Sequence, residues 1–301
     1  MPKAVANGIE LEYETFGNPA GPAILLIMGL GWQMVMWPEE FCEALAKAGY
    51  YVIRYDNRDV GLSTRLHAAG KVRLLRAGLR NALGLRVRAP YTLDDMAEDA
   101  TGLLDTLGLA RAHLVGVSMG GMIGQLAALR HPDRVLSLTS IMSNSGSRKV
   151  PGPSLKLRLR LVRRPSALHR EALIRHGVET MRLIGSPAYP TEEHVRRAKV
   201  ERAHDRASYP RGIARQMMAI MAAPSRTWRL RGLQPPALII HGDADPLVPV
   251  AAAHDLARHI PGARLEIIPG MGHDLPAPLI PRITGMIVEH ARSATTRAQA
   301  A

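Results

Sequence analysis

Cysteine is almost absent from this chain, since Cys42 is the one cysteine among 301 residues. A single thiol excludes a disulfide within the chain, so the fold must be held together by a packed core. Cys42 lies beside Phe41 and Leu45 on the apolar side of an expected helix, which predicts that it is a small buried hydrophobic residue. One thiol also fits a reducing compartment, and we expect a cytoplasmic protein.

Long hydrophobic runs are missing as well, although 47% of the residues are hydrophobic and can form a large core. No apolar stretch approaches the ~18 residues that a membrane-spanning helix needs. The run from Ala23 to Met28 is short and has glycines on both sides, which predicts a buried strand. The N-terminus lacks the charged, apolar and small-residue layout of a secretion signal, so we do not expect export.

Aromatic and acidic residues are scarce: aromatics make up 4% of the chain, and its formal net charge is +13. The basic excess gathers in residues 65–88, with seven Lys or Arg and no acid, and in residues 148–175. Neither segment has a nucleic-acid motif, a zinc pattern or an aromatic stacking platform, so we predict no nucleic-acid partner. Solvated helix faces are the preferred explanation of this charge, and contact with a membrane surface or an acidic ligand is the alternative.

Strand-like and helical segments alternate along most of the chain. Alternation of apolar and polar residues predicts a half-exposed strand at residues 9–16. Short apolar runs predict further strands at residues 23–28, 51–55, 113–117, 135–141, 237–240 and 264–268. Helical spacing predicts helices at residues 38–48, 93–107, 119–130, 250–258 and 279–291. This alternation predicts an α/β fold with a doubly wound, mainly parallel sheet and right-handed crossovers.

The alternation breaks after Ser143. Residues 145–226 keep helical spacing without clear strands, which predicts a helical cap inserted between the fifth and sixth expected strands. The cap would lie over the carboxyl ends of the strands, where open α/β sheets bind ligands. We therefore divide the chain into a core of residues 1–144 and 227–293, a cap of residues 145–226 and a flexible tail of residues 294–301.

The sharpest local motif is Gly116-Val117-Ser118-Met119-Gly120-Gly121, which follows an expected strand and opens an expected helix. This is the context of a nucleophile elbow. On such a tight turn, the residue two positions before the serine and the residue two positions after it must lack bulky side chains. The serine oxygen then stands exposed at the helix N-terminus, which predicts Ser118 as a nucleophile.

A serine nucleophile needs a base, and the base needs an acid that orients it. Among twelve histidines, His273 is the best candidate, because it lies in the glycine-rich loop after the last strand. His241 is expected to shape the turn that precedes the acid. The segment that follows it offers two carboxylates, Asp243 and Asp245, and either can serve as the acid.

Hydrolysis through a serine also needs two N–H donors for the oxyanion. The Met119 amide, directly after the nucleophile, is the first candidate. The second comes from the loop after the strand of residues 23–28, where Leu30 is preferred over Gly29. Flexible apolar side chains suggest an apolar substrate pocket, for which the candidates are Trp32, Met34, Met217, Met218 and Met221.

These motifs together resemble the α/β-hydrolase superfamily along nearly the whole chain, the cap and the tail excepted. The resemblance rests on residues 116–121, on the H-G-x-x-D segment ending at Asp245 and on Gly272-His273. It also includes residues 55–63, similar to a D-x-R-x-x-G-x-S turn, in which we expect Asp56 and Arg58 to be structural. The family places its acid three residues after the glycine, which implies Asp245 rather than Asp243.

One departure narrows the resemblance. Most relatives have His-Gly in the oxyanion loop, whereas this chain has Met28-Gly29, which looks like the branch of aclacinomycin methylesterase-like bacterial esterases. The resemblance implies a carboxylesterase that acts through an acyl-enzyme on small or medium apolar esters, methyl esters and lactones included. It implies no cofactor and no metal, since the acid loop explains Asp243 and Asp245 better than calcium binding does.

Two other functions fit the same parts. A Ser-Met-Gly-Gly elbow, here residues 118–121, also occurs in cofactor-free perhydrolases, in which peroxide replaces water at the acyl-enzyme. Outside enzymes, this fold can act as a ligand receptor with little or no turnover. An intact serine, histidine and aspartate set argues against the receptor.

Overall fold

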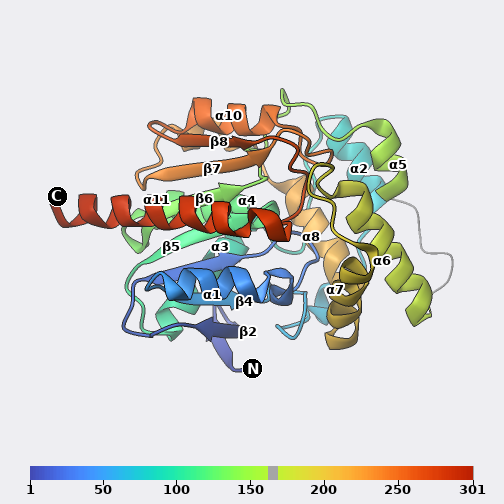
Figure 1. Cartoon of the computed structure of the whole chain (residues 1–301). Coiled ribbons are helices and arrows are strands. Elements are labelled where there is room, and N and C mark those ends of the chain that lie inside the picture. The colour runs from blue at the N-terminus through green and yellow to red at the C-terminus, as the bar shows by residue number, and fades with distance from the viewer. Residues whose placement is uncertain (162–168, 301) are drawn as a thin grey trace.

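The computed structural model describes residues 1–161 and 169–300, which build a central sheet of eight strands (Figure 1). Its strand order is β1-β2-β4-β3-β5-β6-β7-β8. The pairs β1–β2 and β2–β4 are antiparallel and the other neighbours are parallel, as the sequence predicted for a mainly parallel α/β sheet. The strands are β1 (Lys3–Ala6), β2 (Ile9–Phe16), β3 (Ala23–Ile27), β4 (Tyr51–Tyr55), β5 (Ala112–Val117), β6 (Val135–Ile141), β7 (Ala237–Gly242) and β8 (Arg264–Ile268).

Strand β1 was not predicted from the sequence, because four residues are too few to show a pattern. It pairs with β2 through the two-residue turn Asn7-Gly8, in which both φ angles are positive (48° and 76°). Asn-Gly is the preferred sequence for such a hairpin turn, so it was the signal that could have revealed β1. Ala4 and Ala6 are buried, and they extend the core to this edge of the sheet.

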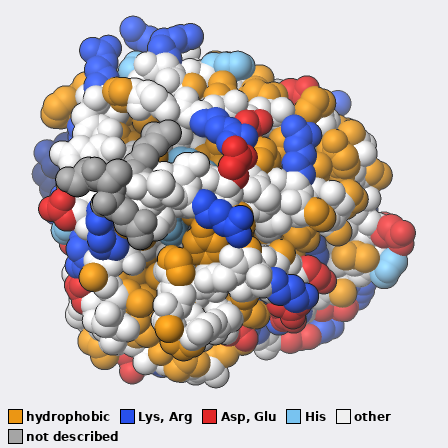
Figure 2. Space-filling view, turned by 60° about the vertical axis from the view of Figure 1, so that its left-hand side comes forward, with side chains coloured by type: hydrophobic (Ala, Val, Ile, Leu, Met, Phe, Trp, Pro, Cys, Tyr) orange, Lys and Arg blue, Asp and Glu red, His pale blue; other side chains and the backbone are white. Residues whose placement is uncertain are grey.

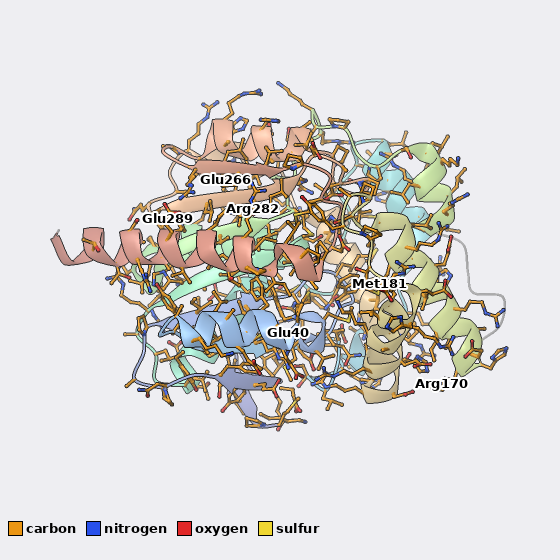
Figure 3. All side chains as sticks on the ribbon, viewed as in Figure 1. Glu40, Arg170, Met181, Glu266, Arg282 and Glu289 are labelled. Atoms are coloured by element: carbon orange, nitrogen blue, oxygen red, sulfur yellow. The ribbon has the colours of Figure 1, made fainter. Side chains whose placement is uncertain are left out.

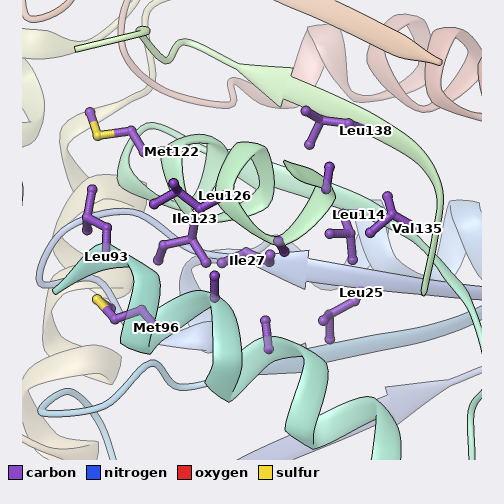
Figure 4. Packing of buried hydrophobic residues seen from close by; sticks show 14 of the residues in the cluster. Leu25, Ile27, Leu93, Met96, Leu114, Met122, Ile123, Leu126, Val135 and Leu138 are labelled. Atoms are coloured by element: carbon purple, nitrogen blue, oxygen red, sulfur yellow. The ribbon is translucent and has the colours of Figure 1, made fainter. Parts of the chain in front are cut away.

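Helices cover both faces of the sheet. On one face lie α1 (Glu39–Lys47) and α11 (Ile280–Ala300), which cross the front of the sheet in Figure 1. On the other face lie α3 (Leu93–Thr106), α4 (Met119–Arg130) and α10 (Ala251–His259). Figure 4 shows the packing of α3 and α4 against β3, β5 and β6.

Strand β3 is covered on both faces, which explains why its sequence is a continuous apolar run. Successive side chains point to opposite faces, so Leu25 and Ile27 enter the core of α3 and α4, while Ile24 and Leu26 pack toward α1 and α11. All four are completely buried. Cys42 on α1 is also completely buried, as predicted, and burial raises the pKa of its thiol to about 12.

A helical insertion leaves the sheet between β6 and β7, as the sequence predicted. It contains α5 (Leu155–Leu161), α6 (Arg170–Ile184), α7 (Glu193–Arg206) and α8 (Pro210–Ala222), followed by the short α9 (Thr227–Leu230). In Figure 1 these cap helices lie to the right of the sheet, away from the C-terminus. The division of the chain at residues 144 and 226 stays a prediction. Residues 162–168 of the basic stretch 148–175 lie outside the described residues.

Two helical segments differ from the prediction. Helix α2 (Leu74–Ala82), between β4 and α3, was not expected, and it packs against α8 of the cap. Helix α11 does not end near residue 291 but continues through Ala300, with Ala294 buried, so helix occupies residues 294–300 of the expected tail. Within the described residues, no helix is both long and apolar enough to cross a membrane.

Burial of His113 on β5 predicts that the stability of the fold depends on pH. Its ring is buried, its Nδ1 lies 2.8 Å from Ser137 Oγ, and burial lowers its pKa from 6.5 to about 4. The unfolded chain therefore binds a proton between these values that the folded chain does not, so stability falls as the pH drops from 6.5 toward 4. Over this pH range His113 lowers the free energy of unfolding by about 3 kcal/mol in total.

We expect His113→Gln to flatten this acid dependence. The measurement is the free energy of unfolding in urea at several pH values between 7 and 4. His254→Gln is the matched control, because it makes the same substitution at an exposed histidine. An unchanged slope in His113→Gln would show that His113 is not the group that titrates.

Candidate active site

Ser118 stands on a strained turn between β5 and α4. Its backbone has φ 55° and ψ −116°, a conformation that a residue with a side chain rarely adopts. Two hydrogen bonds hold this turn: the Ser118 amide donates to the Ile141 carbonyl at 2.9 Å, and Ser143 Oγ donates to the Ser118 carbonyl at 2.7 Å. Strand β6 and the residues directly after it thus fix a conformation that the local sequence alone would not keep.

The glycines around Ser118 are required by close packing. A Cβ atom on Gly116 would lie 2.2 Å from the Gly120 carbonyl oxygen, and one on Gly120 would lie 2.0 Å from the Ile27 carbonyl oxygen. Both distances are far below van der Waals contact with fixed backbone atoms. The steric reason inferred from the G-x-S-x-G spacing is therefore confirmed.

Asp245 and His273 meet in the loops that follow β7 and β8. His273 Nδ1 donates to Asp245 Oδ2 at 2.7 Å, while Asp245 Oδ1 accepts the Leu247 and Val248 amides, each at 2.8 Å. Asp245 and His273 are both buried. This carboxylate can orient the ring and stabilise its positive charge, which is what a catalytic base requires.

Asp243, the alternative acid, has a different partner. Its Oδ1 accepts the Gly270 amide at 2.6 Å, which ties the loop after β7 to the loop after β8. His241 also supports this region: its Nε2 donates to the Val248 carbonyl at 2.7 Å, and burial lowers its pKa. His241 therefore shapes the acid loop as a neutral ring, as the sequence predicted.

Ser118 and His273 come from loops at the same edge of the sheet, because β5, β7 and β8 run parallel. In the described part of the chain no hydrogen bond joins their side chains. The loop after β3 lies against the serine: a Cβ atom on Gly29 would be 3.3 Å from Ser118 Cβ and 3.9 Å from its Oγ. Glycine at this position leaves room beside the serine oxygen.

Two backbone amides near Ser118 are free. Among the described residues, neither the Leu30 amide nor the Met119 amide has a hydrogen-bond acceptor. Met119 opens α4, so its N–H group adds to the positive end of the helix dipole. Unpaired N–H groups at a helix N-terminus and in a facing loop can bind a negatively charged oxygen.

Comparison with known proteins places this arrangement in a family. The model of the alpha/beta hydrolase fold matches residues 22–276. This chain belongs to the α/β-hydrolase fold family. It is 33% identical to the rhodomycin D methylesterases DauP of Streptomyces sp. (strain C5) and DnrP of Streptomyces peucetius, with 95% of this chain and 96% of each relative covered. These relatives confirm the aclacinomycin methylesterase-like resemblance.

A solved structure gives the same family assignment. The enol-lactonase from Burkholderia xenovorans LB400 superposes with a TM-score of 0.73 at 26% identity, covering 96% of this chain and 99% of that chain. The protein is therefore a hydrolase with esterase-type homologues.

The segment that follows β4 joins the hydrolase core to its cap. Asp59 forms a buried ion pair with Arg215 of α8 at 2.7 Å, and Asp56 binds Arg206 of α7 at 2.6 Å. Arg58 instead pairs with Asp99 of α3. These contacts confirm the structural interpretation of Asp56 and Arg58, and they explain how the cap is held.

The cap also holds the loop that carries the free Leu30 amide. Gln216 of α8 is completely buried; its Oε1 accepts the Gly31 amide at 2.8 Å, and its Nε2 donates to the Arg58 carbonyl at 2.8 Å. Gln216 was not predicted from the sequence, because 185 positions separate it from Gly31 and no local pattern marks it.

The five predicted pocket residues occupy different places. Met34 is completely buried, whereas Trp32 and Met217 are partly exposed. Met218 and Met221 pack with Ala77 and Val87 in and near α2. None of the five lines the cavity of about 400 Å³ between α6 and the loops of Asp245 and His273. Their assignment to a substrate pocket stays a prediction.

That cavity lies where the cap meets the loops of the candidate acid and base. Met181 of α6, labelled in Figure 3, forms its cap side, while Ala244, Pro246 and Asp274 form its core side. Burial raises the pKa of Asp274, whose Oδ1 accepts the Ser186 hydroxyl. The lining is mixed, with apolar side chains beside polar ones, and its volume can accommodate a small organic group.

Proposed function

We propose that this hydrolase is a serine carboxylesterase that cleaves small to medium apolar esters, methyl esters and lactones among them. The observation that carries the proposal is the 2.7 Å hydrogen bond from His273 to Asp245, at the same sheet edge as Ser118 on its strained turn. A serine, a histidine and a carboxylate so arranged perform acyl transfer in many hydrolases.

In the proposed reaction His273 Nε2 takes the Ser118 hydroxyl proton as the serine oxygen attacks the ester carbonyl carbon. The new C–O bond gives a tetrahedral oxyanion, which the Leu30 and Met119 amides stabilise. Asp245 stabilises the protonated ring, which then gives its proton to the departing alcohol oxygen. Water, deprotonated by His273, attacks the acyl-enzyme, and the acid leaves as Ser118 regains its proton.

The substrate class is proposed from the relatives. The two relatives at 33% identity are methylesterases, and the enol-lactonase structure points to ring esters. Both reactions break an acyl C–O bond through the same steps. In a lactone the alcohol stays attached to the acyl group, so hydrolysis gives one product instead of two.

A panel of esters tests this function. We expect hydrolysis of p-nitrophenyl esters of short and medium chain length, of apolar methyl esters or of lactones, together with labelling by a fluorophosphonate probe. Absence of both hydrolysis and labelling would contradict the proposal. Peroxide-dependent halide oxidation without ester hydrolysis would instead favour the perhydrolase, and ligand binding without turnover would favour the receptor.

A further inference from the structure

Helix α2 presents its large apolar side chains to solvent and a small one to the protein. Leu75, Leu79 and Leu83, the last just beyond the helix end, follow a spacing of four residues and share one face. They are 91%, 63% and 65% exposed. The opposite face is anchored by Ala77, which is buried in the cluster with Met218 of α8. A helix that only covered the core would have the reverse arrangement.

Exposed apolar side chains gather in this region. Seven of the twelve large hydrophobic side chains that are exposed in the described part lie in residues 74–85 and 155–159. Helix α5 contributes Leu155 and Leu159, which are 71% and 59% exposed. Grouped apolar residues on a protein surface mark contact with another molecule, whereas single scattered ones do not.

The segment that precedes α5 contacts the end of α2. Arg148, which precedes α5, donates from Nη2 to the Asn81 carbonyl at the end of α2 at 2.6 Å. Figure 1 shows α2 and α5 at the same end of the molecule, beyond the strand ends. We call Leu75, Leu79 and Leu83 with Leu155 and Leu159 the leucine surface.

Positive charge surrounds the leucine surface. No acidic residue occurs between Asp59 and Asp94 or between Asp133 and Glu171. The exposed cations here include Lys71, Arg73, Arg76, Arg80, Arg86, Arg88, Lys156, Arg158 and Arg160. None of these side chains forms an ion pair with a carboxylate in the part of the chain that the structure describes. Figure 2 shows Lys and Arg side chains beside exposed hydrophobic ones on the face in view.

We propose that the leucine surface docks the protein on an anionic lipid membrane. Leucines between unpaired arginines match an interface in which acyl chains lie beneath negative headgroups. A second copy of this chain fits less well, because it would bring two basic surfaces together without acidic partners. The contact is peripheral: the leucines enter the headgroup region while the fold stays outside it.

Flotation with vesicles tests the docking. The full chain should float with vesicles of phosphatidylcholine and phosphatidylglycerol, and much less with phosphatidylcholine alone. The triple change Leu75→Gln, Leu79→Gln and Leu83→Gln should weaken binding at least about tenfold, because it removes apolar area that docking on the membrane buries. The double change Arg76→Gln and Arg80→Gln should also weaken it by about tenfold, and added salt should act in the same direction.

Trp228→Gln is the matched control, because Trp228 is 75% exposed on α9 outside the leucine surface and should not affect vesicle binding. The leucine and arginine changes should leave the melting temperature and turnover of a dissolved p-nitrophenyl ester unchanged, which shows that the fold is intact. The proposal is overturned if the wild type ignores anionic vesicles or if the leucine variant binds them equally well. A dimer that the leucine variant dissociates would assign the surface to a second copy instead.

Discussion

Replacing Ser118 with alanine should lower kcat/KM for ester hydrolysis by about 10⁴-fold or more, because it removes the atom that attacks the carbonyl. The chain should still fold. Alanine adds no atom beyond Cβ, and neither bond that holds the turn, from the Ser118 amide to the Ile141 carbonyl or from Ser143 Oγ to the Ser118 carbonyl, uses the Ser118 side chain. The variant should therefore keep its melting temperature while it loses both turnover and fluorophosphonate labelling.

Ser293→Ala is the matched control for this loss. Ser293 is exposed on α11, so its hydroxyl should matter for neither turnover nor stability. Steady-state kinetics with one p-nitrophenyl ester give kcat/KM for the wild type and both variants. If Ser118→Ala turned over that ester at the wild-type rate, the acyl-enzyme mechanism would be wrong.

Replacing Asp245 with asparagine should lower kcat by about 10⁴-fold through a change of tautomer. Asp245 Oδ1 accepts the Leu247 and Val248 amides, and the amide oxygen of asparagine can keep these bonds. The NH₂ group then faces His273 Nδ1, where it can only donate. Nδ1 must become the acceptor and Nε2 carries the proton, so the ring can no longer take the proton of Ser118.

Asp243→Asn is the control that separates the two carboxylates. Its amide oxygen can still accept the Gly270 amide, so kcat should change less than about tenfold. The measurement compares kcat of the wild type and of both variants with the same p-nitrophenyl ester. A large loss in Asp243→Asn with an active Asp245→Asn would reverse the assignment of the acid.

The cap contacts the core beside the candidate active site. Gln216 holds the loop of the proposed oxyanion amide, and the pairs of Asp56 and Asp59 with Arg206 and Arg215 hold the cap on the core. The geometry of the site therefore depends on contacts between the α/β core and the cap helices α7 and α8. The leucine surface lies on that same cap side, where α2 packs on α8.

The sequence by itself determined the features that depend on short-range sterics. Gly116 and Gly120 flank Ser118 within two residues, and their spacing already implied the turn that the structure contains. The alternation of strand and helix determined the mainly parallel sheet, because covered strands are apolar on both faces, as β3 is. The chain order of serine, aspartate and histidine pointed to the same edge of that sheet.

Only the tertiary structure decided what depends on distant partners. Asp243 and Asp245 are two residues apart, and their positions in the sequence alone do not show which is the acid. In the structure Asp243 binds the Gly270 amide, whereas Asp245 binds His273, which lies 28 residues further along the chain. The outward leucines of α2 and the inward amide of Gln216 likewise depend on which helix packs against which. A local pattern reports the propensity of a segment, whereas burial and pairing belong to the contacts that distant segments make.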